Sequence, residues 1–278
     1  MSQQEHSIAI SHASLTLTAS LHLPEPAQGK EGSDSGFPLV VICHGFIGSR
    51  IGVNRLFVRA ARQMAENGYA VLRFDYAGCG ESTGSYGAEG LRSMVQQTKT
   101  VLDYARTIPQ VDPKRISLLG HSLGGATAVL TASKDPRIQE LILWAPVAHP
   151  YQDIADIVGK PLVQQALQQG TADYLSYTLH DIFFTSLQQE QPLFACQQVD
   201  GDVLILHGSA DEVISTDYCF LYDKMMKQRQ RGTVEKEVIF GADHTFSQLA
   251  HQDLLIERTS QWLKDRVKKA ADWNHWTI

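Results

Sequence analysis

The sequence lacks the features of a membrane-spanning or a polyanion-binding protein. Its longest apolar runs, such as 39–43 and 203–206, are far shorter than the roughly 20 residues that a membrane helix needs. The 24 Lys and Arg are outnumbered by 30 Asp and Glu, so no overall positive charge attracts nucleic acid or anionic lipid. We therefore expect neither a nucleic-acid partner nor a membrane.

Targeting and redox signals are also missing. The first twenty residues contain neither a basic segment nor a continuous apolar stretch, which predicts no secretory signal and a cytoplasmic location. The cysteines, Cys43, Cys79, Cys196 and Cys219, are widely separated and have no Cys/His spacing suited to zinc. We expect reduced structural thiols and no metal.

One local basic patch consists of the arginines at 50, 55, 59 and 62. Their spacing is typical of the solvent-facing side of an amphipathic helix, because such a helix carries its charged residues opposite its apolar stripe. The apolar side of this helix is expected to bury Val53, Leu56, Phe57 and Ala60.

The pattern of apolar residues predicts an α/β protein. Residues 8–23 alternate as a strand hairpin does, and 24–36 is rich in turn residues. Short apolar runs then alternate with helical periodicity, which is typical of buried parallel strands and crossover helices. Parallel strands are expected at 39–43, 70–74, 116–119, 141–144, 203–207 and 238–240. Helices are expected near 53–67, 89–106, 122–133, 217–229 and 247–269.

One interval breaks this rhythm. The stretch between the strands at 141–144 and 203–207 is much longer than a normal crossover and is rich in Gln and aromatic residues. We interpret 148–199 as an inserted cap over the carboxyl edge of the sheet, where ligands bind in open α/β folds. The core then comprises 1–147 and 200–278. The alternative is a peripheral helical decoration.

A nucleophile is predicted at Ser122. The strand at 116–119 leads directly into Gly120-His121-Ser122-Leu123-Gly124, followed by a helix, which is G-x-S-x-G in a strand-turn-helix context. This turn exposes the serine hydroxyl on a strained backbone, and the two glycines avoid collisions around it. The alternative is a Gly-Ser turn that only begins a helix.

A base and an acid follow in the order that this context requires. Asp211 comes just after the strand at 203–207, and His244 just after the strand at 238–240. A serine hydroxyl needs a base within reach and a third group to orient that base. Glu212 and Asp217 compete with Asp211 for the acid role. His121, His207 and Asp243 are interpreted as structural, with the His121 side chain directed away from the serine.

Two backbone N–H groups are predicted to bind the developing oxyanion. The first belongs to Leu123, directly after the nucleophile, and the second to Phe46 in the loop after the strand at 39–43. The alternative for Cys43-His44-Gly45-Phe46 is an ordinary strand-to-helix turn.

Together these segments resemble the α/β-hydrolase superfamily over nearly the whole chain. The combination HGF, GHSLGG, HGSADEV and GADHTF, with an insertion before the acid-bearing strand, is most similar to bacterial cinnamoyl/feruloyl esterases. The resemblance implies an α/β-hydrolase fold with a mostly parallel eight-stranded sheet flanked by helices and an inserted cap. It also implies a cytoplasmic carboxylesterase whose cap helps to form the acyl pocket, and it admits a homodimer.

The sequence therefore predicts a serine carboxylesterase that hydrolyses small or aromatic acyl esters without a cofactor. The same residues suit a thioesterase or an acylaminoacyl-type serine peptidase, because fold and triad do not determine the leaving group. A hydrolase fold that only binds a ligand is the third reading.

Overall fold

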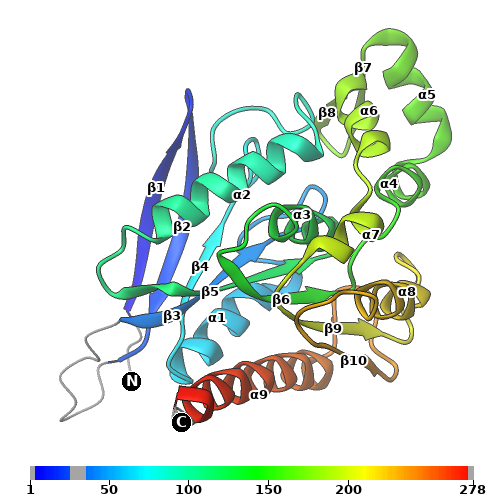
Figure 1. Ribbon diagram of the computed structural model, residues 1–278. Helices are drawn as coiled ribbons and strands as arrows, with labels where there is room; N and C mark the ends of the chain where they lie inside the picture. The colour runs from blue at the N-terminus through cyan, green and yellow to red at the C-terminus, as the bar shows by residue number, and fades with distance from the viewer. Residues whose placement is uncertain (1–3, 26–35, 275–278) are drawn as a thin grey trace.

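An eight-stranded sheet forms the centre of the computed structural model, which describes residues 4–25 and 36–274 (Figure 1). The strand order is β1-β2-β4-β3-β5-β6-β9-β10. At one edge, β1 (Gln4–His12) and β2 (Leu15–Leu23) form the predicted antiparallel hairpin, and β2 pairs antiparallel to β4 (Ala70–Phe74). The loop predicted at 24–36 lies mostly outside the described residues.

The remaining strands run parallel to β4, which confirms the predicted fold class. They are β3 (Phe37–Cys43), β5 (Val111–His121), β6 (Ile138–Trp144), β9 (Asp202–Gly208) and β10 (Val234–Ile239).

The last strand begins earlier than its apolar pattern indicates. We expected it at 238–240, but β10 ends at Ile239 and Phe240 is 92% exposed. Charged residues at 235–237 hide the first half of the strand from an apolar-run criterion. They are tolerated because β10 is an edge strand, where charges also discourage pairing with other chains.

Helices cover both faces of the sheet (Figure 1). One face packs against α1 (Leu56–Glu66) and α9 (Leu249–Asn274). The other packs against α2 (Leu91–Ala105), α3 (Leu123–Ala132) and α8 (Asp217–Met226). In β3, residues 39, 41 and 43 belong to the core under α2, α3 and α8, and residues 40 and 42 belong to the core under α1 and α9. Burial on both faces explains why the parallel strands have continuous apolar sequences.

The basic patch departs from the prediction at its N-terminal end. Asn54 and Arg55 have φ angles of 52° and 62°, so a short 3-10 turn, η1 (Val53–Arg55), precedes the α-helix. Val53 is consequently 57% exposed rather than buried. Arg50 pairs with Asp75 and Glu81 instead of facing solvent.

Between β6 and β9 the chain forms a segment of its own, which we call the β6–β9 insertion. It contains α4 (Pro150–Val158), α5 (Lys160–Gln169), β7 (Thr171–Tyr174), β8 (Tyr177–His180), α6 (Asp181–Gln189), α7 (Pro192–Ala195) and η2 (Cys196–Gln198). In Figure 1, α5, α6 and the β7–β8 hairpin project beyond the sheet.

The β7–β8 hairpin was not predicted. Its two-residue turn consists of Leu175 and Ser176, with φ angles of 47° and 67°. Hairpin turns with two positive φ values normally carry Asn or Gly, so this turn has no recognisable sequence signal.

The fold bears on two further predictions, which concern a membrane helix and the state of the cysteines. In the described part of the chain, no helix combines the length and apolar composition needed to cross a membrane. All four cysteines are buried and free of disulfide bonds. Burial raises the pKa of the Cys79 thiol to about 12 and that of Cys43 to about 11. These thiols are therefore protonated and unreactive at neutral pH.

Candidate active site

Ser122 occupies a strained turn between β5 and α3. Its φ of 57° and ψ of −125° lie in a region that non-glycine residues rarely adopt, at a cost on the order of 1–3 kcal/mol. The Ser122 N–H donates to Trp144 O at 3.0 Å, which helps to hold the turn. A Cβ at Gly120 would lie 2.2 Å from Gly124 O, and one at Gly124 would lie 2.2 Å from Cys43 O. The predicted need for both glycines is thus met in the fold.

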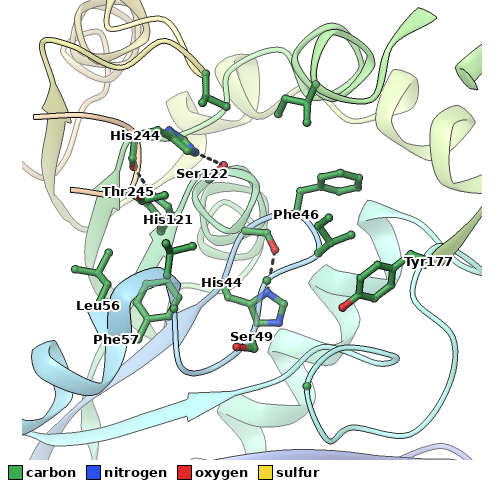
Figure 2. A pocket seen from close by; sticks show the side chains of 18 of the residues that line it. His44, Phe46, Ser49, Leu56, Phe57, His121, Ser122, Tyr177, His244 and Thr245 are labelled. Carbon is green, nitrogen blue, oxygen red and sulfur yellow. Dashed lines mark hydrogen bonds between the residues drawn. The ribbon is translucent and has the colours of Figure 1, made fainter. Parts of the chain in front are cut away.

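The three residues predicted to act together do meet. His244 Nε2 lies 3.0 Å from Ser122 Oγ, and His244 Nδ1 lies 2.8 Å from Asp211 Oδ2. They follow β5, β9 and β10, whose carboxyl ends share one edge of the sheet. Figure 2 shows the His244 ring directed at the Ser122 hydroxyl.

The competing carboxylates lie elsewhere. Glu212 and Asp217 are exposed, and neither contacts His244 among the described residues. Asp243 accepts a hydrogen bond from the Ser247 N–H at 2.8 Å, which agrees with its interpretation as a turn former.

Asp211 has every feature of a carboxylate that stays ionised. Its side chain has no exposed surface, and its Oδ1 accepts the N–H groups of Val213 at 2.9 Å and Ile214 at 2.8 Å. Burial alone would raise the pKa of Asp211, but hydrogen bonds from His207 and His244 outweigh it and hold the pKa well below its usual range. An ionised Asp211 keeps the His244 proton on Nδ1, which leaves Nε2 free to accept the serine proton.

His207 was interpreted as structural, and the structure shows that this support reaches the candidate acid directly. Its fully buried Nε2–H lies 3.0 Å from Asp211 Oδ2 and 3.1 Å from Ile214 O. Asp211 Oδ2 therefore receives two histidine N–H groups. A signal was present in the sequence, because a histidine inside an apolar strand, four residues before an acid, needs a buried polar partner.

His121 also lies closer to the site than expected. We expected its side chain to point away, yet its ring centroid is 5.0 Å from that of His244, and it lines the same cavity as Ser122. Its Nε2–H donates to His244 O at 2.8 Å. Burial is the main cause that lowers the pKa of His121, to about 3, so its ring is neutral. His121 thus holds the loop that carries His244.

The loop after β3 packs directly against Ser122. A Cβ at Gly45 would lie 3.0 Å from Ser122 Cβ. His44 fixes this loop, because its Nδ1–H donates to Gly45 O at 2.9 Å and its Nε2 accepts the Tyr76 N–H at 3.1 Å. Within the described residues, the N–H groups of Phe46 and Leu123 donate no hydrogen bond, so both are available to a ligand.

Ser122 opens into a cavity of about 600 Å³, large enough for a drug-sized ligand. The β6–β9 insertion contributes Ile157, Tyr174 and Tyr177, whereas the Tyr151 side chain lines a different cavity. No Asp, Glu, Lys or Arg is among the described residues that line the cavity at Ser122. Its interior is therefore uncharged as long as His244 is neutral.

An aromatic cluster forms one wall of this cavity. Phe46 lies at its centre, with ring centroids of Tyr86 and Tyr174 at 5.9 Å and of Phe183 at 5.8 Å. The Tyr177 ring joins the cluster through Tyr86, and the centroids of these two rings are 5.7 Å apart. The cluster connects the predicted oxyanion loop with the insertion.

Comparison with known proteins assigns the chain to a family. Residues 37–177 match the model described as serine aminopeptidase, S33. The quorum-quenching protein AidA of Acinetobacter baumannii is 36% identical over 110 residues, which cover 39% of this chain and 35% of AidA. Thiohydrolase apmlB of Arthrinium phaeospermum is 32% identical over 120 residues, 41% of this chain and 36% of that protein. The chain thus spans 35% and 36% of the length of these curated relatives.

Solved structures extend the likeness to the whole fold. Est1E from Butyrivibrio proteoclasticus, solved with ferulic acid bound, superposes with a TM-score of 0.78 at 23% identity. The match covers 94% of this chain and 99% of Est1E. The predicted resemblance to bacterial esterases of the α/β-hydrolase fold is confirmed. Because the family model matches 141 of the 278 residues, from 37 to 177, this chain belongs to the serine aminopeptidase family S33 of α/β hydrolases.

Proposed function

We propose that this protein is a serine carboxylesterase that hydrolyses small or aromatic acyl esters through an acyl-enzyme. The observation that carries the proposal is the hydrogen-bonded line from Ser122 through His244 to the buried Asp211, with spacings of 3.0 Å and 2.8 Å, at the wall of an uncharged cavity.

Acylation begins when Ser122 Oγ attacks the ester carbonyl carbon and its proton passes to His244 Nε2. Asp211 stabilises the resulting imidazolium, and the N–H groups of Phe46 and Leu123 bind the oxyanion. When the tetrahedral intermediate collapses, the bond to the alcohol oxygen breaks and His244 returns the proton to that oxygen. A water molecule then attacks the acyl-serine and gives its proton to His244. His244 passes this proton to Ser122 Oγ as the bond to the acyl carbon breaks, which releases the carboxylic acid and restores the free serine.

The cavity supports an uncharged acyl group. Aromatic rings from Phe46, Tyr174 and Tyr177 offer a wall on which a flat acyl group can pack, at about 0.5–1.5 kcal/mol per ring pair. In this role, residues 148–199 act as a cap that completes the acyl pocket. An aminopeptidase would need a carboxylate to bind the substrate amino group, and none of the described lining residues supplies one. These features favour ester hydrolysis over the removal of a free N-terminal amino acid.

Thioester hydrolysis is the second candidate, since two curated relatives are named thiohydrolases. The same nucleophile and base cleave both bonds. The test compares three derivatives of cinnamic acid under one set of conditions: the methyl ester, the S-ethyl thioester and the anilide. We expect kcat/KM to be highest for the oxygen ester; a thioester preference beyond its greater intrinsic reactivity would replace this function with the second.

The nucleophile is tested by Ser122→Ala. We expect p-nitrophenyl acetate hydrolysis to fall by about 10⁴–10⁶-fold and labelling by a fluorophosphonate to disappear, because no other group can form the acyl-enzyme. Ser133→Ala is the matched control, since Ser133 caps the opposite end of the same helix and, within the described residues, its hydroxyl bonds only Leu130 O. Labelling that survives in the Ser122 variant would refute the proposal.

A further inference from the structure

The two sides of Ser122 are lined by different kinds of side chain. Figure 2 shows Phe46 and Tyr177 on one side of the serine, and His244, Leu56 and Phe57 on the other. We call the first the aromatic side, made of Phe46, Ile157, Tyr174 and Tyr177. We call the second the aliphatic side, after Val53, Leu56 and Val213; it also contains Phe57 and Thr245 and is bordered by His121 and His244.

Contacts show that the aliphatic side is continuous with His244. The His121 ring bridges it, at 5.0 Å from the His244 ring and 6.0 Å from the Phe57 ring. Val213 reaches the same place from the other direction, because its N–H donates to Asp211 at 2.9 Å. Thr245 directly follows His244 in the chain.

Proton return determines which part of an ester lies on this side. If Ser122 and His244 act as proposed above, the leaving oxygen must lie within about 3 Å of His244 Nε2 to receive its proton. The carbonyl oxygen lies toward the N–H groups of Phe46 and Leu123. The alcohol part of the ester therefore extends along the aliphatic side, and the acyl part packs on the aromatic side.

We propose that the natural alcohol is an apolar alkyl group and not a sugar or a polyol. On this side Val53, Leu56, Phe57 and Val213 offer apolar side chains, and the polar side chains are those of Thr245 and of the bordering His121 and His244. A polyol would gain little from apolar contact with Val53, Leu56 and Val213, whereas an alkyl chain would cover their exposed surface. Val53 and Val213 are 57% and 50% exposed, so this side opens to solvent and leaves room for a chain of several carbons.

The experiment uses three esters of one acid: methyl, n-butyl and glyceryl cinnamate. All three give the same acyl-enzyme, so deacylation is identical, and differences in kcat/KM report the effect of the alcohol on binding and acylation. The wild-type protein should hydrolyse the butyl ester with a kcat/KM about tenfold above that of the methyl ester, as expected for partial burial of three methylenes. The glyceryl ester should fall below the methyl ester.

The variant Val53→Thr/Val213→Thr keeps the side-chain volumes and replaces one methyl of each valine by a hydroxyl. It should reduce the butyl-to-methyl ratio to about threefold or less. Tyr177→Ala on the aromatic side is the control, because it should change both rates by a similar factor and preserve the ratio. If the double variant is unstable, Val53→Ser alone tests the same ratio at an exposed position.

The outcomes separate this inference from the proposed function. Equal rates for the three esters, or faster hydrolysis of the glyceryl ester, would overturn the alkyl preference and leave the esterase standing. A wild-type protein that hydrolyses none of the esters and resists fluorophosphonate labelling would overturn both.

Discussion

The loops of the sheet core and the β6–β9 insertion meet at the same cavity but hold their residues in different ways. Asp211 in the core accepts N–H groups from two histidines and two backbone amides. The Tyr174 side chain in the insertion makes one hydrogen bond, of 3.4 Å to Ile157 O, and no hydrogen bond joins the Tyr177 hydroxyl to another described residue. Hydrogen bonds fix the first set, whereas ring packing holds the second.

This contrast separates two requirements of an ester hydrolase. Proton transfer needs atoms held at hydrogen-bond distance, which the core supplies through buried polar contacts. Binding of an acyl group needs only a wall of suitable shape, which aromatic packing supplies without fixed polar partners. Substitutions in the core are therefore expected to reduce kcat, and substitutions in the insertion to raise KM.

Among the variants that test this contrast, the largest loss of activity is expected from Asp211→Asn in the sheet core. The amide would present an N–H₂ group to the histidine N–H groups that now point at Oδ2. His244 would then have to carry its proton on Nε2, and a protonated Nε2 cannot accept the serine proton. We expect kcat for p-nitrophenyl acetate to fall by about 10³–10⁴-fold, with KM little changed.

Asp243→Asn provides the matched control for that variant. Asp243 is a neighbouring carboxylate whose hydrogen bonds, within the described residues, stay in its own turn, to Ser247 and the Thr245 N–H. It should keep nearly full activity. Equal losses in the two variants would mean that loop structure, and not the Asp211 charge, accounts for the effect.

The site residues of the sheet core could be predicted from the sequence better than those of the insertion. The reason is the same difference between hydrogen-bonded groups and packed rings. Ser122, Asp211 and His244 each follow a parallel strand, and the carboxyl edge of a parallel sheet brings such positions together whatever the details of packing. The glycines around Ser122 mark a turn that few other residues allow. Tyr174 and Tyr177 carry no comparable signal, because an aromatic residue at a half-buried position fits a core as well as a pocket.

His207 lay between these cases. Its strand was predicted, and the partner of a buried histidine had to lie nearby, yet only the fold shows that this partner is Asp211. Val53 was assigned to the buried face of a helix, because the positive φ angles that delay the helix have no clear mark in the sequence.

A smaller loss of activity is expected from His207→Leu, which removes one donor from Asp211. Because a hydrogen bond to a charged group contributes about 1.5–3 kcal/mol, kcat/KM should fall by about tenfold to a hundredfold. An Asp211 carboxylate with one donor fewer attracts the His244 proton more strongly, so the acid limb of the kcat/KM profile should move to higher pH.

The conservative variant His207→Gln separates positioning from packing. Its amide N–H₂ can reach the site now occupied by His207 Nε2 and should restore most of the rate and the position of the acid limb. If Gln and Leu behave alike, His207 only fills space in β9, and its contact with Asp211 has no part in orienting His244.

The smallest effect tests the insertion side of the comparison. Tyr177→Ala removes one ring from the aromatic cluster, and the loss of such a ring pair corresponds to about a twofold to tenfold rise in KM for methyl cinnamate. The kcat should change little, because no hydrogen bond links Tyr177 to Ser122, His244 or Asp211. Tyr151→Ala is the control, since Tyr151 belongs to the same insertion but lines a separate cavity. Should Tyr177→Ala reduce kcat and leave KM unchanged, the insertion would take part in positioning the reacting groups, and the division between a hydrogen-bonded core and a ring-packed wall would fail.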